Sequence, residues 1–357
     1  MVTLPEEYRT LSETELLSRL AAAREKLGED VVILGHHYQR DSIIRFADFR
    51  GDSLELSRAA AAQKRARYIV FCGVDFMAET AAMLCHPSQT VLLPALGGKA
   101  QCPMAAMATV EQAQEAWRTL TALWGQDGLV PITYQNSLAE VKAFCGQHGG
   151  AVCTSANARA AMRWALEQGK RLIFFPDEWL GRNSALALGI PPEHIALWDP
   201  ERPEANDPTL AGAHVVVWKG YCHVHTHFTV EHVQAARQTY GDVTVVVHPE
   251  CQVEVVQAAD LNGSTSFILR TVRDAPSGSR FAVGTEIHMV SRLAQDHPDK
   301  RVVPLARSLC GAMYRITPHN LLYTLERLLA GEAVGVVTVP PEISRWANVA
   351  LERMLRQ

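Results

Sequence analysis

Short apolar runs alternate along this chain with longer stretches in which apolar residues recur at helical spacing. Val31–Gly35 reads as an apolar strand, and similar runs occur at Tyr68–Cys72 and Thr90–Pro94. Strands separated by helical stretches of about 10 to 15 residues are typical of α/β layers built on largely parallel sheets. The pattern therefore predicts an α/β fold.

The two ends of the chain are predicted to be helical. Ser12–Glu15 (SETE) forms a capping box that opens a helix, and Gly28 is a suitable place for it to stop. Towards the C-terminus we expect a helix over Asn320–Ala330, a short strand over Val334–Val339 and a final helix from Pro341. One face of the final helix is apolar and carries Ile343, Ala347, Ala350, Leu351 and Met354.

One sequence of features occurs three times in the same order. A strand-like run ends in a polar residue at His36, Asn136 and His248. A serine-bearing turn follows 17, 19 and 16 residues later, at Ser53, Ser155 and Ser264. An apolar run comes next, and each copy closes with a cysteine, at Cys102, Cys222 and Cys310. Near-constant spacing of this kind indicates three copies of one supersecondary unit.

Three such units predict an architecture as well as a site. We expect three similar α/β units with parallel sheets, arranged about a pseudo-threefold axis with the active site on that axis. The expected boundaries are an N-terminal helical extension at 1–29, units at 30–109, 110–228 and 229–318, and a C-terminal helical segment at 319–357. Surplus residues between the first two repeat cysteines fall near 124–128 and in the loop 200–208. Three thiolates would then meet at one point.

Composition excludes several classes of protein. The 357 residues are 48% hydrophobic and 20% charged, which is ordinary for a globular protein. A net charge of −4 and the lack of a basic stripe argue against nucleic-acid binding. No apolar run approaches the roughly 20 residues that span a bilayer, and no signal segment opens the chain. We therefore expect a cytoplasmic protein with no nucleic-acid or membrane partner.

The cysteines are unlikely disulfide partners in such a chain. Five of them sit in or beside apolar runs and are expected to act as small hydrophobic residues: Cys72, Cys85, Cys145, Cys153 and Cys251. Structural zinc prefers four ligands, usually in two close pairs. A [4Fe–4S] cluster with only three protein ligands leaves one iron open as a Lewis acid, which can assist the loss of water.

Polar residues at the equivalent strand ends would surround that centre, because ligands in α/β sheets bind beyond the carboxyl ends of the strands. They are His36, Tyr38, Ser53, Tyr134, Asn136, Ser155, His225, His248, Glu250 and Thr265. These groups suit a small, multiply anionic substrate, and Glu250 could move protons. Taken singly, each is more often a structural hydrogen-bonding group or a helix cap. The alternation of His223, His225 and His227 also leaves a zinc hydrolase open as the weaker interpretation.

Eleven motifs, taken together, resemble the quinolinate synthase family from about Val31 to Met354. They are Gly35–Tyr38 (GHHY), Gly51–Arg58 (GDSLELSR), Val74–Thr80 (VDFMAET), Ala100–Ala105 (AQCPMA), Tyr134–Asn136 (YQN), Cys153–Asn157 (CTSAN), Gly220–His225 (GYCHVH), His248–Cys251 (HPEC), Gly263–Ser266 (GSTS), Gly284–Glu286 (GTE) and Cys310–Met313 (CGAM). Some members of that family carry a CxxCxxC run at the last cysteine, where this chain has only Cys310. A regulatory disulfide is therefore not expected here.

The resemblance implies an enzyme of NAD biosynthesis with three α/β units around a central site. Such an enzyme condenses iminoaspartate with dihydroxyacetone phosphate and releases quinolinate, phosphate and two waters. By resemblance, the ligands of its [4Fe–4S] cluster are Cys102, Cys222 and Cys310. The substrate-binding positions it implies are His36, Ser53, Tyr134, Asn136, Ser155, His248, Glu250 and Thr265. The catalytic groups are Tyr38, His225, His248 and Glu250.

Other functions stay open at this point. Another [4Fe–4S] hydro-lyase acting on a small hydroxyacid would need the same open iron and similar proton-transfer groups. An iron–sulfur sensor would need a partner surface, and a structural zinc protein would differ in metal content. If the resemblance holds, the supplier of iminoaspartate is expected to be L-aspartate oxidase or aspartate dehydrogenase.

Overall fold

The computed structural model describes residues 4–96, 100–203 and 208–356, and within them the strands form three parallel sheets. The first sheet contains β1 (Val31–His36), β2 (Phe49–Gly51), β3 (Tyr68–Cys72) and β4 (Thr90–Leu92). The second contains β5 (Leu129–Tyr134), β6 (Ala151–Cys153), β7 (Arg171–Phe175), β8 (Ile195–Trp198) and β9 (Val215–Trp218). The third contains β10 (Thr244–Val247), β11 (Leu261–Asn262), β12 (Arg280–Gly284) and β13 (Arg301–Pro304). The predicted α/β class is confirmed.

The three sheets share one strand order. The orders are β2-β1-β3-β4, β6-β5-β7-β9-β8 and β11-β10-β12-β13, so in each sheet the first strand of the copy lies between its second and third. Every ladder in these sheets is parallel. A repeated order of this kind is the topology expected when one supersecondary unit occurs three times.

A side-chain contact repeats along with the topology. Asp48 Oδ2 accepts a hydrogen bond from the Ile33 amide at 2.7 Å, and Asp260 Oδ2 accepts one from the Val245 amide at 2.7 Å. Each aspartate precedes the short second strand of its sheet and fixes it against the first strand. The first and third copies are therefore alike in side-chain detail as well as in strand order.

The chain divides into two compact units. Unit 1 consists of Met1–Cys102 and Leu309–Pro340, and unit 2 of Pro103–Ser308 and Pro341–Gln357. The first sheet lies in unit 1, whereas the second and third sheets lie in unit 2. The expected boundaries of three units and their pseudo-threefold arrangement stay predictions.

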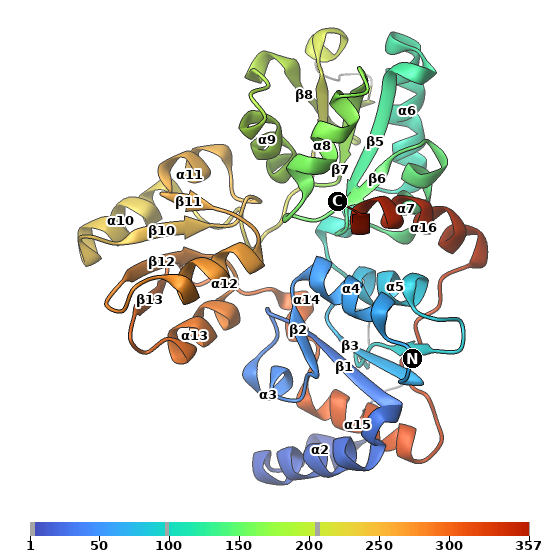
Figure 1. Ribbon diagram of the computed structural model, residues 1–357, viewed down its shortest axis with the longest axis vertical. Helices are drawn as coiled ribbons and strands as arrows, with labels where there is room; N and C mark the ends of the chain where they lie inside the picture. Colours follow the sequence, from blue (N-terminus) through green and yellow to red (C-terminus); the bar gives the residue numbers. More distant parts are fainter. Residues whose placement is uncertain (1–3, 97–99, 204–207, 357) are drawn as a thin grey trace. The chain divides into compact units, whose positions relative to one another are not determined.

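Unit 1 surrounds the first sheet with helices from both ends of its sequence. Its helices are α1 (Glu6–Arg9), α2 (Glu13–Leu27), α3 (Asp41–Ile44), α4 (Ser53–Ala62), α5 (Asp75–Leu84), α14 (Gly311–Tyr314) and α15 (Pro318–Leu329). Helices α2 and α15 lie side by side (Figure 1). Arg19 of α2 joins Glu326 of α15 with Nη2 and Oε2 2.6 Å apart.

Most of the elements predicted at the chain ends in unit 1 are present. Ser12 caps α2 by accepting a hydrogen bond from the Glu15 amide, and Gly28, with φ of 50°, ends that helix. Helix α15 matches the predicted helix to within two residues at its start. The predicted strand over Val334–Val339 is wrong. Only Val336 forms an antiparallel bridge there, with Leu92, because Gly335 next to it adopts φ of 73°, which breaks an extended run.

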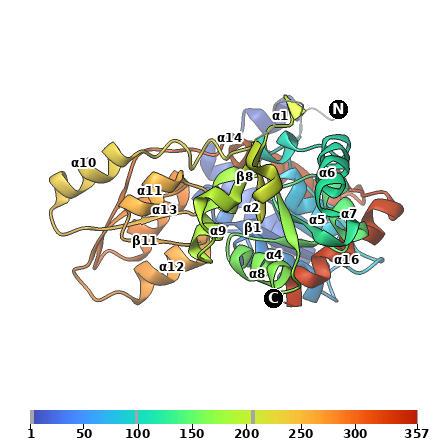
Figure 2. The same ribbon diagram turned by 90° about the horizontal axis from the view of Figure 1, so that it is seen from above.

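Unit 2 carries the remaining helices. They are α6 (Val110–Trp124), α7 (Ala139–Gln147), α8 (Ala158–Leu166), α9 (Glu178–Ala187), α10 (Val230–Tyr240), α11 (Val253–Ala258), α12 (Thr265–Asp274), α13 (Ile287–Asp296) and α16 (Pro341–Arg356). The final helix α16 packs beside α7 (Figures 1 and 2). Four residues of its predicted apolar face are buried: Ala347, Ala350, Leu351 and Met354.

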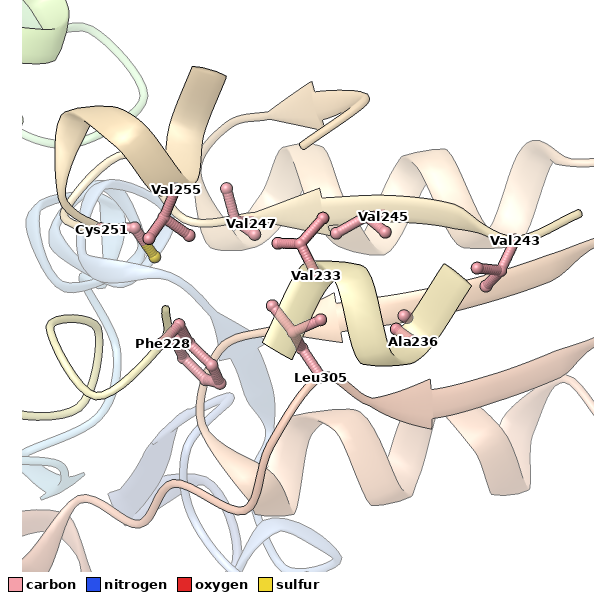
Figure 3. Close-up of a cluster of buried hydrophobic side chains, with 10 residues drawn as sticks. Phe228, Val233, Ala236, Val243, Val245, Val247, Cys251, Val255 and Leu305 are labelled. Carbon is pink, nitrogen blue, oxygen red and sulfur yellow. The ribbon is translucent and has the colours of Figure 1, made fainter. Parts of the chain in front are cut away.

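The core of the third sheet shows how these layers close. Figure 3 shows Val233 and Ala236 of α10 beside Val245 of β10, with Cys251 and Phe228 near the carboxyl end of that strand. All five belong to one buried apolar cluster. A core packed this closely up to the strand end holds the residues that follow β10 in fixed positions.

Two segments account for the surplus residues in the second sheet. The stretch near 124–128 is a short 3₁₀ turn, Gln126–Gly128, after α6. The second surplus is larger than the predicted loop, because an additional strand, β8, is inserted at the sheet edge before β9. Residues 204–207 of the predicted loop lie outside the described residues.

Across the described residues, none of the helices has the length and apolar character needed to cross a membrane.

Candidate active site

One backbone hydrogen bond recurs at all three repeat cysteines. The carbonyl two residues before each cysteine accepts from the first amide of the helix that follows the third strand of its copy. The bonds are Asp75 N to Ala100 O at 3.1 Å, Glu178 N to Gly220 O at 2.8 Å and Ile287 N to Ser308 O at 2.8 Å. The residue two positions before each cysteine is thereby fixed beyond the carboxyl end of a parallel sheet, which is where α/β proteins bind ligands.

In unit 1, the turn after β1 is joined to the segment that follows Cys310. Gln39 Nε2 donates to the Met313 carbonyl at 3.1 Å, and Arg40 Nη2 donates to the Tyr314 carbonyl at 2.6 Å. Cys310 itself is the N-cap residue of α14. The last repeat cysteine is therefore tied to the strand end that carries His36.

His36 is buried and held in one tautomer. Its Nδ1 accepts from the Tyr38 amide at 3.1 Å, so the proton of the neutral ring lies on Nε2. The Tyr38 ring packs edge-on against it with centroids 4.7 Å apart. His36 also pairs in register with Gly51, two residues before Ser53. The structure therefore brings His36, Tyr38 and the Ser53 turn together at one edge of the first sheet.

In unit 2, five of the predicted residues form one connected network. His225 Nδ1 lies 2.5 Å from Glu250 Oε2, and the Tyr134 side chain also hydrogen-bonds to Glu250. The His225 and His248 rings stack with centroids 4.2 Å apart. His248 Nε2 lies 3.2 Å from Ser155 Oγ. Tyr134 ends β5, Ser155 follows β6, His225 lies in the turn after β9, and His248 and Glu250 follow β10.

The electrostatics of the network favour a carboxylate beside a neutral imidazole. Burial acts to raise the pKa of Glu250, but His225, His248 and the hydrogen bonds from His225 and Tyr134 together lower it to about 2. Burial, followed by the neighbouring His225, lowers the pKa of His248 to about 3. The Glu250 amide donates to His248 Nδ1 at 3.3 Å, which leaves the ring proton on Nε2, facing Ser155.

His225, one of the predicted catalytic residues, is hydrogen-bonded at both ring nitrogens. Its Nδ1 is bonded to Glu250, and its Nε2 lies 3.1 Å from Thr285 Oγ1. The side chain is 2% exposed. Both nitrogens of His225 are therefore engaged inside the protein, one of them by the Glu250 carboxylate.

Cys222 adjoins the same network. Ligand atoms of Cys222, His225 and Glu250 all lie within 4.8 Å of one another. The histidine and the carboxylate already satisfy each other at 2.5 Å, whereas the half-buried cysteine presents its sulfur beside them. Cys222 is thus the member of this group suited to a soft metal.

The comparisons with known proteins agree over nearly the whole chain. The family model described as "Quinolinate synthetase A protein" matches residues 18–356. The chain belongs to the quinolinate synthase family. The quinolinate synthase of Corynebacterium glutamicum is 49% identical over 356 residues, covering 99% of this chain and 90% of that protein. The quinolinate synthase of Bacillus cereus is 46% identical over 357 residues, covering 99% of this chain and 96% of that protein.

Membership of the quinolinate synthase family confirms the resemblance drawn from the motifs. The protein is an enzyme of NAD biosynthesis. Among solved structures, a reductase of E-1-hydroxy-2-methyl-but-2-enyl-4-diphosphate from Plasmodium falciparum matches with a TM-score of 0.25 and 13% identity, over 92% of this chain and 86% of that one. A match this weak supports no conclusion about fold or function.

The eight cysteines of this family member are all thiols, and they fall into two groups. Burial raises the pKa of Cys72, Cys145, Cys153 and Cys251, and also of the half-buried Cys85. Because the thiolate is the metal-binding form, these five are poor ligands. Four of them are fully buried, as expected for small hydrophobic residues.

The three histidines that suggested a zinc hydrolase do not form one site. His223 and His227 are exposed, whereas His225 is buried, so the three rings do not share a face. The segment is a turn, in which the His225 amide donates to the Cys222 carbonyl at 3.1 Å. Alternation in the sequence suggested a strand, but the turn set by Cys222 overrides it.

In the third copy, the residue equivalent to Ser53 is Thr265, one position after the predicted Ser264. Ser264 caps α12 and Thr265 is the first helical residue, just as Asp52 caps α4 and Ser53 is first. Ser53 follows His36 by 17 residues, and Thr265 follows His248 by 17. Thr265, which is 4% exposed, is therefore the counterpart of Ser53.

Two residues near the network were not among the predicted site residues. Thr285 contacts His225, and Asp177 is fully buried at the N-cap of α9, where the charge of Glu250 acts on it. Both follow the third strand of a copy, as does the N-cap residue Glu286. For Asp177, the sequence did offer a signal, since an acidic residue recurs two or three positions after that strand in each copy, at Asp75, Asp177 and Glu286.

Proposed function

We propose that this enzyme condenses iminoaspartate with dihydroxyacetone phosphate to give quinolinate, phosphate and two waters. We further propose that a [4Fe–4S] cluster is held by Cys102, Cys222 and Cys310. The single observation that carries the proposal is the backbone hydrogen bond repeated two residues before each of these cysteines. Three cysteines that each follow this repeated bond support a three-ligand centre.

The residues fit the cluster by their chemistry. All three cysteines are half-buried, so they are accessible to a metal but partly shielded from water. They lie far apart in sequence, unlike the close cysteine pairs of structural zinc sites. When bound, a cluster with three cysteine ligands supplies one open iron, a Lewis acid for substrate oxygen or nitrogen.

Glu250 is the residue best suited to move protons. It is ionised, 1% exposed, and held by His225 and Tyr134. In this account Glu250 takes a proton from carbon or nitrogen of the bound substrates and returns it to a departing hydroxyl. His225 fixes the carboxylate for that role, and the neutral His248 orients Ser155.

Two unsatisfied acceptors support the proposed substrate positions. Among the described residues, Asn136 Oδ1 and Glu250 Oε1 are buried oxygens with no hydrogen-bond partner. A buried acceptor of this kind costs about 1 to 3 kcal/mol unless a ligand satisfies it. The N–H group of iminoaspartate and the hydroxyls of dihydroxyacetone phosphate are donors that would do so.

The anionic groups of the substrates need donors in turn. In unit 1 these would be His36 through its Nε2 proton, Ser53 and Tyr38, with Tyr38 also able to act as an acid. In unit 2 they would be Ser155, Thr265 and the Tyr134 hydroxyl. L-aspartate oxidase or aspartate dehydrogenase would supply the iminoaspartate, and the cytoplasm is the proposed location.

Metal analysis tests the cluster directly. Protein isolated without oxygen is expected to hold about four irons and four acid-labile sulfides per chain. The variant Cys222→Ser should lose most of both. Cys85→Ser is the matched control, because Cys85 is also half-buried but has a raised pKa. Stoichiometric zinc without sulfide, or equal iron in both variants, would refute the cluster.

Product analysis then separates the proposed reaction from other dehydrations. The loaded enzyme, given dihydroxyacetone phosphate and freshly generated iminoaspartate, should form quinolinate and one phosphate per turnover. A different [4Fe–4S] hydro-lyase would release water from a hydroxyacid without forming a pyridine ring.

A further inference from the structure

Asn183 lies in the middle of α9, and its side chain leaves that helix to hold another segment of unit 2. Its Nδ2 donates to the carbonyl of Pro249 at 2.9 Å and to the carbonyl of Cys251 at 2.8 Å. These two residues stand on either side of Glu250 in the chain. A side-chain amide nitrogen carries two donor hydrogens, and here both are used on the backbone that flanks one carboxylate residue.

The segment held in this way is the buried turn that follows β10. Within the turn, the Cys251 amide donates to the His248 carbonyl at 3.0 Å, and the Glu250 amide donates to His248 Nδ1 at 3.3 Å. These two bonds shape the turn but join it only to itself. The bonds from Asn183, which is 8% exposed, connect the turn to the helix that follows β7. Buried carbonyl groups need donors, so this connection also satisfies the backbone of the turn.

The first copy offers an internal comparison. Helices α5, α9 and α13 each begin with the amide that bonds to the carbonyl two residues before a repeat cysteine. Five residues after that amide, each helix carries a buried polar side chain, namely Thr80, Asn183 and Arg292. Thr80 Oγ1 donates to the Phe76 carbonyl of its own helix at 2.8 Å. Asn183 differs from Thr80 because its donors reach another element, at the turn that carries Glu250.

We propose that Asn183 is a positioning residue for the reaction, and that it determines where the Glu250 carboxylate stands by holding the carbonyls on both sides of that residue. This inference rests on the proposed function, in which Glu250 moves protons. A proton-transfer group must lie within hydrogen-bond reach of the atom it serves, and a displacement of about 1 Å is enough to slow the reaction strongly. Asn183 acts through the backbone of the turn, while the proton transfer itself belongs to Glu250.

The carboxylate of Glu250 is thus held from two directions. His225 and Tyr134 bond to the carboxylate end of the side chain. They determine where that end points only as long as the backbone that carries the side chain stays in place. Because Asn183 holds that backbone from α9, loss of its donors lets the turn shift even though the contacts at the carboxylate are unchanged in kind.

Kinetics of Asn183→Leu test the proposal. Leucine has a similar volume but no donors, so kcat per iron-loaded enzyme should fall about 10- to 100-fold, with KM and iron content unchanged. The matched control is Thr80→Val, which removes a buried hydroxyl bonded within its own helix and should keep the parental kcat. Asn183→Ala covers the case in which the leucine variant does not fold. Parental kcat in a folded Asn183 variant would overturn the proposal.

A double variant shows whether Asn183 acts through Glu250. Added to Glu250→Gln, the Asn183→Leu substitution should cause no further fall in the residual kcat, because the group that it positions no longer transfers protons. The same fold-loss in both backgrounds would mean that Asn183 acts independently, which would contradict the proposal.

Hydrogen exchange gives a measurement that does not depend on activity. The amides of Glu250 and Cys251 should exchange faster in Asn183→Leu than in the parent, while the strands of the second sheet keep their protection. Parental exchange in the turn would overturn the positioning role. A parent that forms no quinolinate would refute the proposed function instead, whatever the exchange rates show.

Discussion

Single residues of the network have roles that depend on contacts no sequence pattern reveals. His225 and His248 look equivalent in the sequence, since each is a histidine near a strand end. Both rings have both nitrogens engaged, but His225 Nδ1 bonds to the Glu250 side chain, whereas His248 Nδ1 accepts from the Glu250 amide and its Nε2 faces Ser155. The repeat predicted that polar residues follow the strand ends, but which of them contact one another, and the direction of each hydrogen bond, required the structure.

Replacing Glu250 by Gln should abolish turnover while leaving the fold and the cluster intact. The amide has nearly the same shape but cannot accept a proton, so we expect kcat to fall by about 10²- to 10⁴-fold. Steady-state quinolinate formation and iron content measure the two effects. The control is Glu254→Gln on the adjacent α11, where the side chain is exposed. Near-normal activity of the Glu250 variant would remove this residue from the mechanism.

Asp177 also predicts a pH dependence of stability. Its pKa is raised in the folded protein, whereas the unfolded chain ionises near pH 4. Above that pH the folded state binds the extra proton, so this residue's stabilising contribution falls as pH rises toward the folded pKa. Asp177→Asn lacks this loss. As the pH rises between the unfolded and the folded pKa, the free energy of unfolding of this variant should rise relative to that of the parent by about 1.4 kcal/mol per pH unit.

Denaturant unfolding of both proteins between pH 5 and 8 measures the difference, with Glu286→Gln as the reference variant. Parallel curves for parent and Asp177→Asn would show that Asp177 titrates alike in both states.

At the level of elements, the repeat could be recognised in the sequence because each copy has a similar apolar strand followed by a polar residue. The parallel sheets could be predicted from that pattern, whereas the strand order within each sheet required the structure. The insertion of β8 could not be predicted, since Ile195–Trp198 is a short apolar run that fits a strand or a buried turn equally well. The one-residue shift at Thr265 was hidden because Ser264 is itself a good cap.

The repeated bond before each cysteine requires close backbone approach at Gly220. A Cβ atom there would lie 2.1 Å from the Pro176 carbonyl oxygen, a backbone atom that cannot move aside easily. Gly220→Ala should displace the Cys222 loop, destabilise the protein by about 1 to 3 kcal/mol and lower its iron content. Thermal unfolding and iron analysis report the two effects.

Gly212→Ala is the matched control in the same unit. A Cβ atom at that position meets nothing within 4 Å. Iron content equal to the parent's in the Gly220 variant would show that the bond to Glu178 does not govern how Cys222 is presented.

At the scale of the whole molecule, the chain does not fold strictly in order. Residues 309–340 join unit 1, and the chain then returns to unit 2 with α16. The apolar face of α16 could be predicted from the spacing of its apolar residues. The surface that this face covers could not be predicted, because any apolar surface of matching width could pack against it. The structure supplies the answer at Gly146 of α7. A Cβ atom at Gly146 would lie 1.9 Å from the Trp346 carbonyl oxygen, so only glycine allows the two helices to meet this closely.

This returning helix should contribute strongly to the stability of unit 2. Leu351 is 0% exposed, and Asn157 Nδ2 donates to the Met354 carbonyl at 3.2 Å on the same helix. Leu351→Ala removes buried methyl groups and leaves a cavity, so we expect a loss of about 2 to 5 kcal/mol. Glu352→Ala, which breaks only an exposed pair with Arg356, should cost about 1 kcal/mol or less. Denaturant unfolding distinguishes them, and equal losses would mean that α16 is not packed as the structure shows. Because Leu351 is not one of the proposed substrate-binding residues, its variant should keep the parent's kcat at temperatures where it is folded.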